Sequence, residues 1–366
     1  MDFSLDQTQE TVAEIVVGLL AREPGDPADP GGFSPELWQA LAKADLLSLV
    51  LPERLGGDGL GLLEVATMLT EIGRGAAPVP ALATLGFGVL PVLALGSTEQ
   101  QDSLLDGVQA GRVLTAALAE PGAAFPAVPS TSAVADGGDV VVTGLAVAVP
   151  FADLAHRILV PTDAGVVPVA PDAPGVTLTR SATSSGAPEF TVRMDGVRVP
   201  AGDVLSGGLD GVATLYRIAL ASIGAYADGL LAGATALAAD HLTTREQFGK
   251  PLAAFQAVAQ QIADVYVTSR TLHVAALASA WRVAEGLDAD SAVDMASADN
   301  DLDVTAYWLA TEVPAAMRTL HHLHGGIGVD VTYPMHRYFS IAKDLARLVG
   351  GASYRLDLVG ARCSSI

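Results

Sequence analysis

The sequence predicts an α+β protein in which an N-terminal helical domain, a middle β domain and a C-terminal helical bundle follow one another. Capped, helix-length segments fill about the first 113 residues. Short valine- and threonine-rich runs, separated by glycine, proline and aspartate, then continue to about residue 207. Long helical segments occupy the remainder. We therefore expect domains at residues 1–113, 114–207 and 208–366.

The N-terminal third shows capped helices joined by loops. Residues 8–22 are amphipathic, and the stretch EPGDPADPGG after them is predicted to be a linker. Ser34, Pro35 and Glu36 supply an N-cap, a first-turn proline and a first-turn acid for the next helix. The glycine-rich turn in LPERLGGDGLG leads into a further helix, residues 62–73. It follows no strand and lacks the G-x-x-x-x-G-K-[ST] pattern, so we expect a tight turn there and no phosphate loop.

The longest uncharged run, residues 76–98, has the length of a membrane span. Pro78, Pro80 and Pro91 interrupt it, and glycines are scattered through its second half. We interpret the run as a buried helix and its approaches.

The middle third alternates strand signals with turn signals, which is typical of a β-barrel or sandwich. The predicted strands cover residues 139–149, 156–162, 165–170, 175–180 and 189–200.

The last third predicts a four-helix bundle. Its helices are expected at residues 212–243, 255–285, about 291–324, and 343 to the end. The second carries a stripe at three- and four-residue steps, formed by Phe255, Val258, Ile262, Val265, Leu272 and Ala276.

Composition limits the classes of protein to which this chain could belong and predicts its location in the cell. Half of the 366 residues are hydrophobic and 17% are charged, so the chain is globular and is expected to associate with other chains. A formal charge of -21 disfavours nucleic acid and anionic membranes, so an anionic ligand needs a local group of cations such as Arg245 and Lys250. One cysteine, Cys363, and an acidic N-terminus without a secretory pattern predict a reducing, cytoplasmic location.

The segment TLHHLHGGIG places three histidines together and raises the question of a metal site. His321, His322 and His324 have no acidic or cysteine partner nearby in the sequence, which disfavours zinc. A helix end stopped by Gly325 and Gly326 is the favoured interpretation, and no metal is expected. Serine-nucleophile motifs and a dinucleotide-binding glycine fingerprint are also missing.

Four motifs in this order resemble the acyl-CoA dehydrogenase family over nearly the whole chain. They are MDFSLDQTQETVAEIVVGLLARE, LPERLGGDGLGLLEVATMLTEIGRG, TREQFGKPLAAFQ and HLHGGIGVDVTYPMHRYF. The resemblance implies FAD-dependent α,β-dehydrogenation of an acyl-CoA thioester, with a carboxylate that removes the α-proton while a hydride passes to the flavin. It also implies that each FAD lies between two chains, one forming the flavin pocket and the other reaching across to it.

Most residues that would reach across to the FAD of the other chain match the family's motifs. The resemblance assigns FAD contacts to Arg245, Phe248, Gln256, His322, Gly325 and Gly326. His322 stands where many members have glutamine, and its imidazole can still make one hydrogen bond.

The flavin pocket of the chain itself looks eroded. LAEPGAAFP keeps Glu120 to Gly122 of the family's Thr-Glu-Pro-Gly turn but has Ala119 in place of the threonine. Ala148 and Pro150 replace the tryptophan and threonine that would face the flavin. Alanine offers no ring face and proline no backbone N–H.

The catalytic base is missing as well. Val349, before Gly350, takes the position of the usual glutamate, and Tyr216 takes the alternative position used by some members. A tyrosine with an ordinary pKa of about 10 is a poor base at neutral pH. Asp344 is displaced to another helix face and is not expected to substitute. No residue of this chain is therefore predicted to be catalytic.

A chain that keeps the FAD contacts but has lost the flavin pocket resembles the base-less subunit of bacterial α2β2 acyl-CoA dehydrogenases of steroid or cholesterol side-chain degradation. The resemblance implies a homologous partner that holds the base, the FAD pocket and most of the acyl-CoA, with two FAD per tetramer. Two alternatives stay open: a homomeric enzyme with an unrecognised base, and a non-enzymatic scaffold of the same fold. The identity of the acyl group, of the partner and of the electron acceptor does not follow from the sequence.

Overall fold

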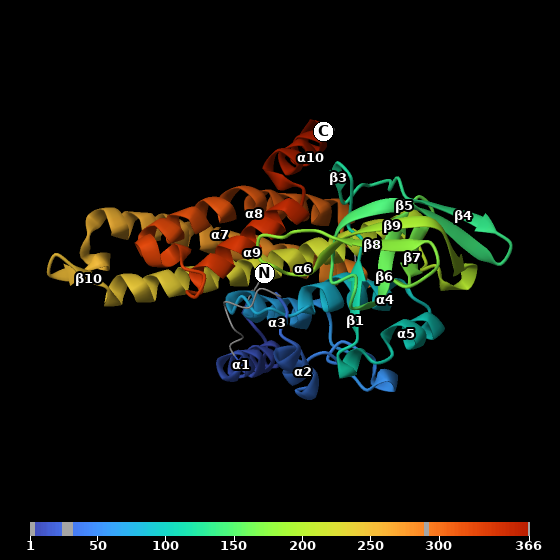
Figure 1. The fold of residues 1–366 in the computed structure, drawn as a ribbon, viewed down its shortest axis with the longest axis horizontal. Coiled ribbons are helices and arrows are strands. Elements are labelled where there is room, and N and C mark those ends of the chain that lie inside the picture. The colour runs from blue at the N-terminus through green and yellow to red at the C-terminus, as the bar shows by residue number, and fades with distance from the viewer. Residues whose placement is uncertain (1–3, 24–31, 289–292, 365–366) are drawn as a thin grey trace.

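The computed structural model describes residues 4–23, 32–288 and 293–364. The linker predicted after the first helix lies mostly outside these residues, and so does the side chain of Cys363. The molecule is elongated, with a hairpin at one end of a long helical bundle and a β domain at the other end (Figure 1). The N-terminal helices pack along one side of the bundle (Figure 1).

The N-terminal helices begin where the sequence supplies caps. Asp6 forms a capping box with Gln9 at the start of the first helix, and the Ser34 hydroxyl accepts the Leu37 N–H at the start of the second. The helices are α1 (Gln7–Arg22), α2 (Pro35–Lys43), α3 (Leu62–Arg74), the π-helix η2 (Leu82–Val89), α4 (Leu90–Leu95) and α5 (Thr98–Leu105). Short 3-10 turns lie at Glu53–Leu55 and Val108–Ala110.

The uncharged run at residues 76–98 is buried, as predicted, and contains η2 and α4. Another helix, Gly208–Thr244, is long and apolar enough to cross a membrane, but 83% of its apolar window is buried inside the protein. Both segments serve as core helices here.

The middle of the chain forms two sheets, as the strand signals predicted. The order β1-β6-β7 makes a three-stranded sheet, and β3-β2-β5-β9-β8 makes a larger one to which β4 adds by pairing with β5. The strands are β1 (Val113–Ala116), β2 (Ala119–Glu120), β3 (Ala123–Ala124), β4 (Ser132–Asp136), β5 (Asp139–Pro150), β6 (Ala155–Thr162), β7 (Gly165–Val169), β8 (Val176–Arg180) and β9 (Glu189–Pro200). The turn η4 (Ala201–Asp203) leads out of the sheet.

The C-terminal bundle contains α6 (Gly208–Thr244), α7 (Gln256–Leu287), α8 (Met295–His324) and α9 (Met335–Leu348). Between α6 and α7 lie the hairpin strands β10 (Glu246–Gln247) and β11 (Lys250–Pro251) and the turn η5 (Leu252–Ala254), and η6 (Gly325–Val329) follows α8. The predicted stripe on α7 has a buried centre at Val265, Leu272 and Ala276. The arrangement of helices, strands and helices confirms the predicted fold class.

The expectation of one helix from Lys343 to the end is wrong. Gly350 and Gly351 adopt φ of 92° and 81°, a left-handed conformation that ends α9 and starts α10 (Gly351–Ser364) in a new direction. The helix α10 rises away from the bundle (Figure 1).

Close backbone contact ties the N-terminal helices to the bundle. A Cβ at Gly229 of α6 would lie 1.7 Å from the Thr70 carbonyl oxygen, and one at Gly233 would lie 2.0 Å from the Arg74 carbonyl oxygen. Glycine is therefore required at these positions for α3 to pack on α6.

Candidate functional site

The hairpin after α6 carries an exposed and strained aromatic residue. Phe248 and Gly249 form the two-residue loop between β10 and β11, with φ of 53° and 79°. Such loops favour Asn-Gly, and an ordinary residue in the left-handed region costs about 1–2 kcal/mol. Phe248 nevertheless leaves 93% of its surface exposed. Strain that is retained without any packing gain in the chain itself indicates a functional constraint on this position.

The hairpin is held in a defined shape against the start of α7. The Lys250 Nζ lies 4.2 Å from the centre of the Phe255 ring, and Phe248 meets the same ring edge-on at 6.4 Å. The Leu252 N–H donates to the Arg245 carbonyl at 2.9 Å. Gln256 follows directly as the first residue of α7, with its side chain exposed.

The end of α8 lies beside the last turn of α6, which leads into this hairpin. Gly325 ends the helix with φ 62° and ψ -142°, a conformation that glycine adopts readily. The His324 ring before it stacks on the His241 ring of α6 at 4.7 Å and 21°, and the His241 carbonyl accepts the Arg245 N–H. Two segments about 80 residues apart in the sequence are thus brought together.

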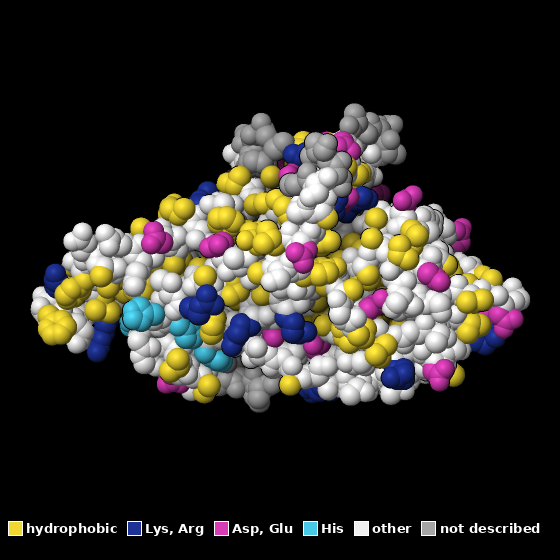
Figure 2. Space-filling view, turned by 90° about the horizontal axis from the view of Figure 1, so that it is seen from above, with side chains coloured by type: hydrophobic (Ala, Val, Ile, Leu, Met, Phe, Trp, Pro, Cys, Tyr) yellow, Lys and Arg dark blue, Asp and Glu magenta, His cyan; other side chains and the backbone are white. Residues whose placement is uncertain are grey.

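The six residues expected to contact FAD therefore gather at one end of the bundle and are all exposed. We call this group the hairpin-end surface; it comprises Arg245, Phe248, Gln256, His322, Gly325 and Gly326. Histidine, lysine and arginine side chains gather toward this end of the molecule, although the chain as a whole is acidic (Figure 2). Within residues 4–23, 32–288 and 293–364, no group of three or more His, Cys, Asp or Glu side chains could hold a metal ion.

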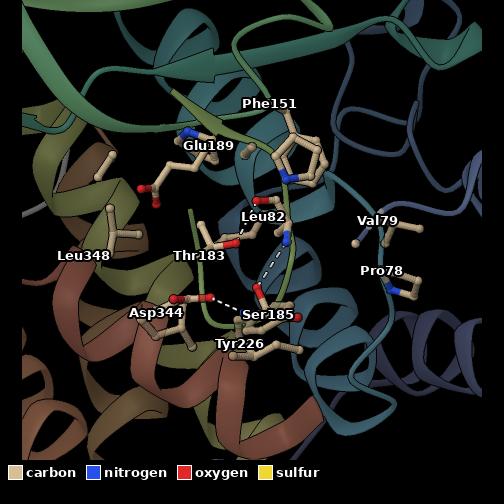
Figure 3. A pocket seen from close by; sticks show the side chains of 18 of the residues that line it. Pro78, Val79, Leu82, Phe151, Thr183, Ser185, Glu189, Tyr226, Asp344 and Leu348 are labelled. Carbon is tan, nitrogen blue, oxygen red and sulfur yellow. Dashed lines mark hydrogen bonds between the residues drawn. The ribbon is translucent and has the colours of Figure 1, made fainter. Parts of the chain in front are cut away.

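A separate cavity lies where β5 ends, next to the loop between β8 and β9 (Figure 3). Residues 77–87 and α9 complete its wall. Ala148 and Pro150, the replacements for the expected tryptophan and threonine, both line it. Its volume is about 130 Å³, whereas pockets for cofactors and comparable ligands measure about 300–1,000 Å³. The cavity is too small for a flavin with an acyl group beside it.

Polar contacts fix the walls of this cavity. Asp344 of α9 lines it and accepts the backbone N–H groups of Ser184 and Ser185, both at 2.9 Å (Figure 3). This ties the β8–β9 loop to the bundle and leaves both carboxylate oxygens engaged. Glu189 on the same wall is paired with Arg347. Neither carboxylate is free to act as a base in this arrangement.

Tyr216 is unsuited to act as a base. It is buried near the start of α6 and meets the Phe125 ring edge-on at 5.3 Å. Burial, and after it the nearby Glu120 carboxylate, raises the pKa of the Tyr216 phenol above its ordinary value. The phenol therefore stays protonated at neutral pH.

Val349 is fully buried and faces a structural ion network. Its carbonyl accepts the Arg355 Nε–H at 2.6 Å, and Arg355 is 1% exposed. The Arg355 Nη1 donates to Asp303 at 3.1 Å, and the Arg362 Nε donates to the other Asp303 oxygen at 2.7 Å. The ring of Phe125 lies 5.1 Å from the Arg355 guanidinium carbon. Paired charges and aromatic rings surround both base positions, and a cavity of about 170 Å³ lies beside Tyr216, Asp303 and Arg355.

The hairpin-end surface and the base position at Tyr216 lie far apart in one chain. Tyr216 and Arg245 are 29 residues apart along α6 and its C-cap, which corresponds to about 43 Å at 1.5 Å per residue. The hairpin and the β domain occupy opposite ends of the molecule (Figure 1). One chain therefore cannot direct both groups of residues at the same cofactor.

Sequence reasoning missed several residues that shape these regions. Arg355, Asp303, His241 and His324 take part in contacts between helices that are distant in the sequence. Arg355 and Asp303 did leave a signal in the sequence, since each is a charged residue on an otherwise buried helix face. Charged residues are rarely buried without a partner. The histidine pair left no such pattern.

Comparison with known proteins identifies the family. Residues 4–112 match the acyl-CoA dehydrogenase N-terminal domain and residues 214–363 match the C-terminal domain. Acyl-CoA dehydrogenase FadE28 of Mycobacterium tuberculosis is 50% identical over 365 residues, covering 100% of this chain and 99% of that protein.

Two solved complexes share the fold over almost the whole chain. A chain of the ChsE4-ChsE5 complex of Mycobacterium tuberculosis is 31% identical with a TM-score of 0.90, covering 100% of both chains. A chain of the Tcur3481-Tcur3483 steroid ACAD is 33% identical with a TM-score of 0.88, covering 98% of both. The chain therefore belongs to the acyl-CoA dehydrogenase family, whose members are FAD-dependent oxidoreductases.

Proposed function

We propose that this chain is the non-catalytic subunit of a heteromeric acyl-CoA dehydrogenase. In this proposal the hairpin-end surface contacts FAD that is seated in a homologous partner chain. The partner contributes the base, the flavin pocket and most of the acyl-CoA site. The assembly is an α2β2 tetramer with two FAD, built from chains with the domain division at residues 1–113, 114–207 and 208–366.

The observation that carries the proposal is the contrast between the two ends of the chain. At one end Phe248 is strained and 93% exposed, and Arg245 and Gln256 beside it are exposed as well. At the other end the cavity measures only about 130 Å³, and the base positions hold a buried valine and a buried tyrosine. A chain that keeps the FAD-contacting residues but lacks the pocket residues and the base is suited to complete a site in another subunit.

The hairpin-end surface fits the diphosphate and the edges of FAD. The Arg245 guanidinium offers a planar donor fork suited to a diphosphate. Phe248 provides a ring face, and Gly325 and Gly326 allow close approach because they have no Cβ. The His322 imidazole can donate or accept one hydrogen bond. When bound, FAD supplies the hydride acceptor for the dehydrogenation, and this chain's role is to hold and orient it.

The relatives favour a steroid-derived substrate, and we propose a cytoplasmic location. One neighbour is a steroid ACAD and two neighbours are complexes of unlike chains. By this analogy we propose that the partner binds the CoA thioester of a steroid side chain, such as arises in cholesterol catabolism.

Co-expression tests the proposal. The chain is produced alone and together with any acyl-CoA dehydrogenase encoded next to it, and flavin absorbance and acyl-CoA turnover are measured after purification. We expect a colourless or insoluble chain alone and a yellow, active complex. Bound flavin with turnover by the lone chain would instead establish a homomeric enzyme, and absence of flavin from both preparations would establish a scaffold.

A matched pair of arginine variants tests the contact itself. Arg245→Ala in the complex should lower the flavin content, because a charge-assisted contact to the diphosphate is lost. Arg198→Ala removes an exposed arginine of the β domain, paired with Asp136 and Asp139, and should leave the flavin content unchanged. Equal flavin content in both variants would contradict the assignment of Arg245.

A further inference from the structure

Two histidines join the two halves of the hairpin-end surface. His241 lies one helical turn before Arg245, in the last turn of α6, and His324 is the last residue of α8, directly before Gly325. Their rings stack with centres 4.7 Å apart and planes 21° apart. This stack lies directly beneath the two turns that carry Arg245 and the exposed glycines.

The stack is built around a buried, neutral imidazole. His324 is 5% exposed, and its Nδ1 lies 2.7 Å from the Leu320 carbonyl, so Nδ1 carries the proton that is donated. Its Nε2 is buried and has no hydrogen-bond partner among the described residues. On its other side the ring contacts the Tyr333 ring at 5.4 Å. A bare ring nitrogen held between aromatic rings is compatible with the neutral form of this histidine.

We propose that His241 and His324 are positioning residues whose neutral stack holds the Arg245 turn and the Gly325 turn together, so that both reach the same FAD. The inference rests on the proposed function, because it assumes that these turns contact FAD. It adds that retention of the cofactor depends on the protonation of this histidine pair.

The surroundings of the pair oppose its protonation. Burial lowers the pKa of His324, and His241 and His321 lower it further, while the Leu320 and Leu237 carbonyls act in the opposite direction. Burial also lowers the pKa of His241; Arg245 adds to this effect and Asp240 opposes it. The Tyr333 phenol, which faces the pair from the segment before α9, has a pKa raised by burial and stays neutral.

These directions determine the pH range of the effect. Both histidines bind a proton less readily in the folded chain than in the unfolded chain, whose histidines titrate near pH 6.5. The stabilisation by the neutral stack is therefore fully present above about pH 6.5 and is lost as the pH falls toward the lowered values. Protonation places like charges in the stack, beside Arg245, and drives the two turns apart.

The test follows flavin release from the co-purified complex as the pH is lowered from 8 to 5, with the fluorescence of free FAD as the readout. The unmodified complex should keep its flavin at pH 8 and release it as the pH falls from about 6.5 through the lowered pKa values of the pair. His324→Phe keeps a ring for stacking but cannot be protonated, so it should release several-fold less flavin at the acidic end. His241→Phe, at the less buried position, should shift the release in the same direction and serves if His324→Phe does not assemble.

A histidine outside the bundle is the matched control. His156 of β6 also has a pKa lowered by burial, and His156→Phe should leave the release profile unchanged. If the His324→Phe and His241→Phe complexes release flavin at the same pH as the unmodified complex, the inference is wrong. If Arg245→Ala has no effect on flavin content at pH 8, the proposed function itself fails, which is a separate outcome.

Discussion

Asp303 is the centre of the buried ion network beside Tyr216 and Val349, and its removal gives the sharpest test of whether that network is structural. It is 3% exposed and accepts from Arg355 at 3.1 Å and from Arg362 at 2.7 Å. Arg355 is 1% exposed, so it cannot turn to water when its partner is lost. Asp303→Ala therefore leaves a buried guanidinium without a counter-charge.

The expected cost follows from this burial. Breaking a buried ion pair by removing one partner costs about 3–5 kcal/mol. The unfolding entropy of 366 residues is about 0.8 kcal/mol/K at about 2.1 cal/mol/K per residue. The melting temperature should therefore fall by about 4–6 °C.

Thermal unfolding of the purified complex, followed by circular dichroism, measures this shift against two comparison variants. Asp136→Ala breaks an exposed pair with Arg198, whose side chains are 62% and 53% exposed, and should cost less than about 1 kcal/mol. Asp303→Leu combined with Arg355→Met replaces the buried pair by apolar side chains and should recover most of the loss.

Two results would refute the reasoning. If Asp303→Ala and Asp136→Ala shift the melting temperature equally, the network does not behave as a buried structural element. If the double variant is no more stable than Asp303→Ala, the loss does not come from an unpaired buried charge. Either result would show that the ion pairs of Asp303 are not a structural network that stabilises the region around the base positions.

Two further predictions concern the hairpin and the lost base. Phe248→Gly should lower the flavin content of the complex. It should change the free energy of unfolding by less than about 1 kcal/mol, because relief of the left-handed strain offsets the added freedom of the unfolded chain. An unchanged flavin content would count against a role for the ring. Val349→Glu should leave the lone chain inactive in an acyl-CoA assay with an artificial electron acceptor, since the new carboxylate would be fully buried and the cavity lined by Ala148 and Pro150 stays small, at about 130 Å³. Turnover by this variant would show that only the base was missing.

Local sequence signals predicted most of the secondary structure. Caps such as Ser34, valine- and threonine-rich runs such as residues 189–200, and the apolar stripe of α7 specify elements through neighbours a few residues away. These signals fail at the C-terminus. The helical pattern continues on both sides of the two glycines after Val349 and so predicts one helix, whereas the glycines separate α9 from α10. The motifs also supplied the six residues of the hairpin-end surface, whose contact with FAD is still a prediction.

Only the tertiary structure decided how these parts meet. The contact of Asp344 with the loop at Ser184 spans 160 residues, and the stack of His241 on His324 joins two separate helices. No periodicity encodes such contacts, because they depend on how α6, α8 and α9 pack against one another and against the sheet. Motifs along the chain were enough to predict the family and the replaced side chains at residues 119, 148, 150 and 349. The packing of the helices shows that the loop at Ser184 is tied to α9 beside the cavity, and that the six residues of the hairpin-end surface are exposed about 43 Å from Tyr216 along α6.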